Sequence, residues 1–83
     1  MKRSESAMAR RVGDELVILD VGSSHYFGLN DVGALIWDRL EQESTRADLV
    51  DAVVASYDVD REQAAGDIDD LVDQLVDRGL VQR

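Results

Sequence analysis

The 83-residue chain contains no cysteine and no proline, and its one lysine lies near the N-terminus. Without cysteine the chain can form neither a disulfide framework nor a thiolate metal site. It also lacks any apolar run near the ~18 residues that a membrane span requires, and its start has no apolar stretch like that of a signal peptide. From this length and a hydrophobic content of 45%, we expect one small globular domain in the cytoplasm, with no membrane partner.

Positive charge is scarce in the second half of the chain. The formal net charge is −9, from 9 lysine and arginine residues against 18 aspartate and glutamate residues. Residues 1–30 carry four groups of each sign, so the whole excess lies in residues 31–83, with five basic and fourteen acidic groups. An acidic surface repels phosphate backbones, so this composition disfavours nucleic acid as a partner.

Residues that carry out catalysis or bind metals are also few. The single histidine, His25, follows Ser24 directly, and neighbours on a strand point to opposite faces, so the two do not form a nucleophile–base pair. Asp69, Asp73 and Asp77 recur every four residues, but one helix face does not surround a cation. Neither a glycine-rich phosphate loop nor its lysine is present. The sequence therefore predicts no enzyme, no metal and no cofactor.

The N-terminal third of the chain has the pattern of short β-strands. Residues 1–6 are predicted to be a flexible lead-in, before a single domain at residues 7–83. Three apolar or β-branched segments predict strands, at residues 7–12, 16–21 and 25–29. Gly13-Asp14 and Gly22-Ser23-Ser24 are favoured turn sequences between these segments. Such short turns predict an antiparallel sheet in chain order, with the third strand at an edge.

The rest of the chain has helical periodicity, with start and stop signals for three helices. Good N-caps precede them, at Asn30, Thr45 and Asp60. Gln63 is placed to complete a capping box with Asp60, and Gly79 suits the left-handed position of a Schellman cap after a third helix of about 18 residues. The chain therefore predicts an α+β fold, a winged helix-turn-helix-like arrangement in which a three-stranded antiparallel sheet is followed by three helices.

The third predicted strand is the surface that most suggests a function. Residues 25–29 include two aromatic residues and no charged side chain when the histidine is neutral. An edge strand of this kind invites pairing with another strand, and most proteins protect such edges with lysine, proline or bulges. Either the third helix covers this edge, or the edge and the helix together form a groove that binds an extended peptide by strand addition.

A sequence resemblance favours the second alternative. Residues 26–40 read Tyr-Phe-Gly-Leu-Asn-Asp-Val-Gly-Ala-Leu-Ile-Trp-Asp-Arg-Leu, which resembles the PqqD-like family of peptide-modification chaperones. These proteins are the recognition elements of pathways that modify ribosomally synthesised peptides. The pattern continues along the chain at Thr45, Asp48, Leu49, Tyr57, Asp67, Ile68, Leu71, Leu75, Gly79, Leu80 and Val81. The resemblance covers roughly residues 8–82.

The resemblance implies a non-catalytic protein with a winged-helix-like fold. In this family the leader of a precursor peptide adds as a strand beside the third strand, in a cleft walled by the third helix. The chain looks most like the stand-alone leader-binding proteins of lasso-peptide clusters, whose partners are a separate leader peptidase and an ATP-dependent cyclase. Three other readings stay open: a chaperone for a radical-SAM pathway, an antitoxin-like interaction module, and a DNA-binding winged helix. The last is disfavoured because residues 60–78 hold two arginines against seven acidic residues.

The resemblance also implies a set of peptide-binding residues. They are Ser24, His25, Tyr26, Phe27, Gly28 and Leu29 on the third strand, and Asp67, Asp70, Leu71, Gln74 and Leu75 on the third helix. Which face of the strand looks into the groove stays open, because a shift of one residue reverses it. Ile36 and Trp37 are assigned to the core.

Overall fold

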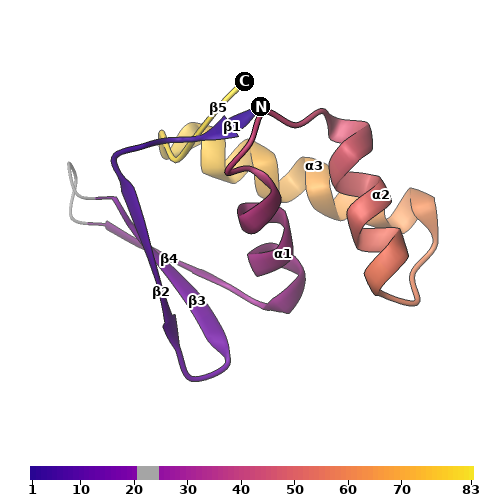
Figure 1. Cartoon of the computed structure of the whole chain (residues 1–83), viewed down its shortest axis with the longest axis horizontal. Helices are drawn as coiled ribbons and strands as arrows, with labels where there is room; N and C mark the ends of the chain where they lie inside the picture. Colours follow the sequence, from indigo (N-terminus) through magenta and orange to yellow (C-terminus); the bar gives the residue numbers. More distant parts are fainter. Residues whose placement is uncertain (21–24) are drawn as a thin grey trace.

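The computed structural model describes residues 1–20 and 25–83, so the predicted turn at residues 22–24 and the candidate site residue Ser24 lie outside the described residues. The elements in chain order are β1 (Lys2–Arg3), β2 (Ala7–Val12), β3 (Glu15–Asp20), β4 (His25–Leu29), α1 (Asp31–Arg39), α2 (Arg46–Ser56), α3 (Arg61–Asp77) and β5 (Val81–Gln82). The predicted fold class is confirmed, because β2, β3 and β4 form an antiparallel sheet in that order and three helices follow (Figure 1). No described helix is long and apolar enough to cross a bilayer.

The three-stranded sheet follows the predicted segments closely. β2 and β4 have the predicted bounds, and β3 begins one residue earlier than expected, at Glu15. Gly13 adopts a left-handed φ of 60° in the two-residue turn, which leaves Val12 opposite Glu15. Ile18, which is fully buried, lies opposite Phe27 on β4, so this side of the sheet faces the core.

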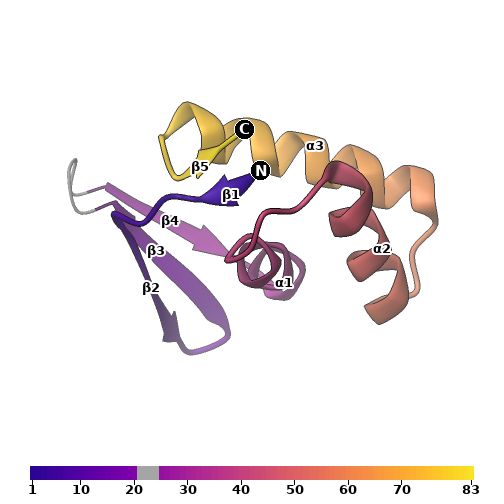
Figure 2. The ribbon, with the colours of Figure 1, turned by 45° about the horizontal axis from the view of Figure 1, so that its top comes forward.

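The helices pack around a single core. α1 lies between the sheet and α2, and α3 runs along one side of both helices (Figure 2). Ile36 and Trp37, on α1, are 1% and 3% exposed, which confirms their assignment to the core. The cluster also takes in apolar residues from β3, β4, both other helices and β5, among them Ile18, Leu29, Leu49, Ile68, Leu75 and Val81. One continuous core of this kind is what a domain this small requires for its stability.

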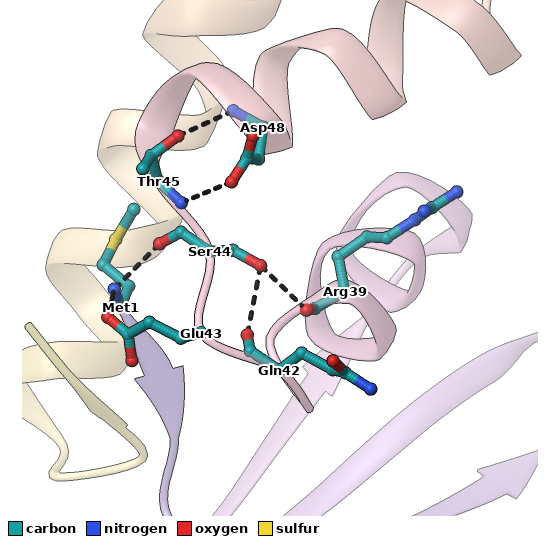
Figure 3. Close-up of polar contacts among 7 residues, drawn as sticks. All are labelled: Met1, Arg39, Gln42, Glu43, Ser44, Thr45 and Asp48. Carbon is teal, nitrogen blue, oxygen red and sulfur yellow. Dashed lines mark hydrogen bonds and ion pairs between the residues drawn. The ribbon is translucent and has the colours of Figure 1, made fainter.

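The first two helices begin at the predicted N-caps. The Asn30 Oδ1 atom accepts a 2.9 Å hydrogen bond from the backbone N–H of Gly33. Thr45 and Asp48 form a reciprocal capping box, in which each side chain accepts a hydrogen bond from the backbone N–H of the other, at 3.1 and 2.9 Å (Figure 3). Each N-cap of this type stabilises the fold by about 1 kcal/mol.

The start of α3 differs from the prediction in one respect. Asp60 is the N-cap, and its Oδ1 atom accepts a 2.7 Å hydrogen bond from the backbone N–H of Gln63. The Gln63 side chain does not accept the expected hydrogen bond from the backbone N–H of Asp60. Instead, the Gln63 Nε2 atom donates to both carboxylate oxygens of Asp67, at 3.3 Å. An acceptor one turn further along the same helix face is within reach of the amide and competes with the cap.

The end of α3 confirms the predicted Schellman cap. Gly79 has a φ of 73°, in the left-handed region that costs glycine nothing. The Leu80 N–H donates to the Leu75 carbonyl at 2.8 Å, and the Gly79 N–H donates to the Val76 carbonyl at 3.0 Å. Leu80 and Leu75 are both buried in the core. The helix is 17 residues long, against the expected 18 or so.

Residues 1–6 differ from the expected flexible lead-in. Lys2 and Arg3 form β1, which pairs antiparallel with β5 at the other end of the chain. The Arg3 guanidinium carbon lies 5.4 Å from the centroid of the Trp37 ring, and the terminal ammonium of Met1 donates to the carbonyl of Ser44 at 2.8 Å (Figure 3). The Arg3 side chain thus covers an aromatic ring of the core through a cation–π contact.

Candidate functional site

A groove lies between the edge strand β4 and α3. Its wider part has a volume of about 620 Å³ and is lined by β4, by the first turns of α1 and by α3. Among the described residues, β3 is the only strand that pairs with β4, so the backbone groups on the other edge of β4 face this groove. A free strand edge beside a helix wall is the geometry that strand addition requires.

The two faces of β4 present different side chains. Phe27 lies opposite the buried Ile18 and is partly buried, so its side chain is on the helix side of the sheet. Tyr26 is 71% exposed and lies opposite Leu19, so it points to the outer face. His25 and Leu29 share the face of Phe27, whereas Gly28 shares the face of Tyr26. The sequence left open which face of this strand looks toward the third helix; in the structure it is the face that carries Phe27.

The helix wall of the groove is one row of α3 side chains. Asp67, Leu71 and Gln74 line the wider part of the groove, at the spacing of three and four residues that puts side chains on one helix face. Asp70 is exposed and does not line the groove; its backbone carbonyl accepts a 3.3 Å hydrogen bond from the Gln74 amide. Leu75 is 0% exposed and belongs to the core, so its position differs from the predicted one in the groove wall.

The groove continues past Phe27 into a narrower part of about 270 Å³. His25 and Tyr26 line this part from β4, and Asp77 and Arg78 line it from the end of α3. The Arg78 guanidinium carbon lies 5.0 Å from the centroid of the Phe27 ring, a cation–π contact that connects the helix to the strand. Phe27 lines both parts.

Several residues of the groove are absent from the predicted set. Val32 and Ile36, on α1, also line the wider part; Val32 is partly buried and Ile36 is almost fully buried. Glu15, at the start of β3, lines the same part, and Arg78 lines the narrower one. Sequence periodicity indicates that Val32 and Ile36 are on an apolar stripe, but it does not indicate that one border of that stripe opens into a groove.

Two members of the acidic row on α3, Asp69 and Asp73, form ion pairs and do not line the groove, whereas Asp77 lines its narrower part. Arg46 donates from Nε and Nη2 to the two oxygens of Asp69, at 2.6 and 2.9 Å, and this hydrogen bonding lowers the pKa of Asp69 and raises that of Arg46. Asp73 pairs with Arg83. Within residues 1–20 and 25–83, no three His, Cys, Asp or Glu side chains are grouped as a cation site would need.

A second hollow, of about 470 Å³, lies between the opposite edge of the sheet and α1. Leu35 and Trp37 line it from α1, and Arg11 of β2 reaches across to Asp31, with 3.9 Å between the nitrogen and the carboxylate oxygen. Because Arg10 and Arg11 are adjacent on β2, this edge carries charges of the kind that discourage strand pairing. The groove beside β4 is the stronger candidate, since β4 bears aromatic residues and no formal charge.

Comparison with known proteins agrees with this fold along nearly the whole chain. Residues 15–81 match the family described as coenzyme PQQ synthesis protein D (PqqD). No curated protein matches the sequence.

Two solved structures are similar in both sequence and fold. The first is TbiB1 in complex with the TbiA(beta) leader peptide, at 35% identity and a TM-score of 0.87, with 99% of this chain and 95% of that chain covered. The second is lasso peptide synthetase B1 complexed with the leader peptide, at 30% identity and a TM-score of 0.84, with 99% of this chain and 96% of that chain covered. A sheet with a free edge strand, three helices and a family match across most of the length lead to one conclusion: this chain belongs to the PqqD family.

Proposed function

We propose that this protein binds the leader region of a ribosomally synthesised precursor peptide of a lasso-peptide pathway. The leader adds as a strand to the free edge of β4, in the groove walled by α3. The observation that carries the proposal is that groove itself, an uncharged edge strand facing an apolar and acidic helix wall. The two similar structures support it, because both are complexes with a leader peptide.

Two kinds of contact bind the leader in this proposal. Backbone groups of β4 give hydrogen bonds that set the register of the added strand and depend little on its sequence. Phe27 and Leu71, on opposite walls of the groove, offer apolar surface to alternate side chains of the leader. Ordering a disordered leader costs free energy, so we expect a dissociation constant between ~10 nM and ~5 µM.

The protein has a presenting role and carries out no chemistry in this proposal. It holds the leader for a separate leader peptidase and an ATP-dependent cyclase in the cytoplasm, where the precursor is made. A second candidate is a chaperone for a radical-SAM peptide-modifying pathway, and it is kept because the matched family takes its name from coenzyme PQQ synthesis and not from lasso peptides. The two differ in which enzyme acts faster on the precursor when this protein is added.

The test is a calorimetric titration with two leaders, each with a scrambled control of the same composition. One is the TbiA(beta) leader, and the other is the leader of any short precursor peptide found to be encoded beside this gene. Saturable binding of either leader, lost on scrambling, is the expected result. If neither leader binds at ~50 µM, ten times the weakest expected dissociation constant, the proposal is wrong and the groove has another occupant.

A further inference from the structure

Glu15 begins β3, yet its side chain reaches the groove beside β4. Glu15 and Val17 lie on the same face of β3, and Gly28 of β4 pairs with Val17, so Glu15 and Gly28 share the outer face of the sheet. The Glu15 Oε2 atom lies 3.5 Å from the position that a β-carbon on Gly28 would occupy. Because Gly28 has no side chain, the carboxylate of Glu15 can cross over β4 toward its free edge.

The groove is acidic at this end. Within residues 1–20 and 25–83, the Glu15 carboxylate forms no hydrogen bond or ion pair. Asp67 lines the same part of the groove from α3, and its carboxylate accepts hydrogen bonds from the amide of Gln63. The described residues that line this wider part include these two carboxylates and no lysine, arginine or histidine. The narrower part is lined by Asp20 and Asp77 as well as by Arg78 and His25, so only this part of the groove has basic side chains among its described lining residues.

A strand that adds to β4 has one residue directly opposite Gly28. Its side chain points to the same face as Gly28, which is the face where Glu15 lies, whichever direction the added strand runs. The β-carbons of such opposed residues are about 4.5–5.5 Å apart, so a long cationic side chain at this position reaches the carboxylate. A neutral or acidic side chain at the same position leaves Glu15 without a partner or repels it.

We propose that Glu15 is a specificity-determining residue that forms an ion pair with a lysine or arginine of the leader at the position opposite Gly28. The inference rests on the proposed function, since it concerns the peptide that adds to β4. It fixes where on the leader the positive charge lies. It also gives the leader an orientation, with the basic residue at the end of the groove lined by Glu15 and Asp67.

The experiment is a lysine scan of whichever of the two leaders binds more tightly. Each leader residue is replaced in turn by lysine or, as the neutral match, by glutamine, and affinities are measured for the wild type and for Glu15→Gln. Asp14→Asn is the matched control, because it removes the neighbouring charge in the turn and Asp14 does not line the groove. Glu15 is exposed at the start of a strand, so neither change removes core packing; circular dichroism confirms the fold of each variant.

We expect one leader position at which lysine binds wild type about two- to fivefold more tightly than glutamine does, the range for an exposed ion pair. The gain disappears in Glu15→Gln, persists in Asp14→Asn, and fades between about 20 and 500 mM salt because screening shortens the reach of the charges. Glu15→Lys reverses the preference, so a leader with glutamate at that position binds this variant more tightly than a leader with lysine there.

Two results overturn the inference and leave the proposed function standing. In the first, the leader binds, but at no position does lysine raise the affinity in a way that Glu15→Gln abolishes. In the second, lysine raises the affinity, and a further variant, Asp67→Asn, abolishes this effect while Glu15→Gln does not. A complete absence of leader binding refutes both together.

Discussion

Leu71 and Leu75 lie four residues apart on α3, and the same substitution at each is expected to have opposite consequences. Leu75 is 0% exposed in the core, whereas Leu71 is partly buried and lines the groove. Replacement by alanine therefore tests stability at one position and peptide binding at the other. A pair of this kind removes the usual ambiguity of a groove variant that fails to bind because it fails to fold.

For Leu75→Ala, the loss of packing in a closed core costs about 2–5 kcal/mol of the free energy of unfolding. In a domain of this size each kcal/mol lowers Tm by about 4–8 °C, so Tm falls by at least about 8 °C. The leader affinity of the molecules that stay folded is unchanged, because Leu75 has no exposed surface to offer a peptide.

For Leu71→Ala, the cost in stability is smaller, because part of the side chain is already in contact with water. The substitution removes three carbons, each worth about 0.8 kcal/mol when buried. If the leader covers roughly half of that surface, about 1 kcal/mol of binding free energy is lost, a fivefold or so increase in the dissociation constant. Val76→Ala is the control, since Val76 is also partly buried on α3 and does not line the groove.

Thermal melts by circular dichroism and calorimetric titrations at a temperature where every variant is folded measure both quantities. The reasoning is refuted if Leu71→Ala melts as early as Leu75→Ala, or if Leu71→Ala and Val76→Ala bind the leader equally well.

Three further predictions concern the fold. Thr45→Ala removes the capping box of α2 and should lower Tm by about 4–8 °C, equivalent to about 1 kcal/mol, with leader affinity unchanged because α2 does not line the groove; an unchanged Tm would contradict it. Gly79→Ala forces a β-carbon into the left-handed region at a φ of 73° and should cost about 1–2 kcal/mol in a urea titration, whereas Gly66→Ala, within α3 and with open space around it, should not destabilise the protein. The pKa of Asp69 is lowered in the folded state, so its pair with Arg46 stabilises the fold above the ordinary aspartate pKa of 3.8, and this stabilisation is lost as pH falls through the lower folded pKa. Asp69→Asn should therefore lose less stability than wild type in that acidic range. Equal losses in the two proteins would speak against it.

The local sequence signals were sufficient to predict the three strands of the main sheet and the three helices. Asn30, Thr45 and Asp60 are each followed by the donor that an N-cap satisfies, and Gly79 follows the last apolar residue of α3, so the helix ends follow from neighbouring residues alone. Strand alternation and short turns predicted the order of the sheet for the same reason.

Contacts between distant parts of the chain were beyond such signals. The pairing of β1 with β5 joins the two ends of the chain, and nothing in residues 1–6 indicates that partner. The placement of Arg78 over Phe27 depends on how α3 crosses the sheet. Gln63 had two acceptors within reach, and the sequence does not say which of them it takes.

The candidate site was predicted in outline and missed in its details. Leu71 and Leu75 both belong to the apolar stripe of α3, and periodicity does not tell which of them borders an opening. The face of β4 toward the groove required the register with β3, in which Phe27 lies opposite a buried residue and Tyr26 does not. Glu15 was missed because it reaches the groove from another strand, over a glycine.

Amide hydrogen exchange of residues 25–29, followed by NMR with and without bound leader, tests the central claim most directly. Strand addition predicts that the alternate amides of β4 that point away from β3 gain protection when the leader binds, and that the amides of β2 do not change. Leader binding that leaves β4 unprotected, or that protects β2 instead, would contradict the account.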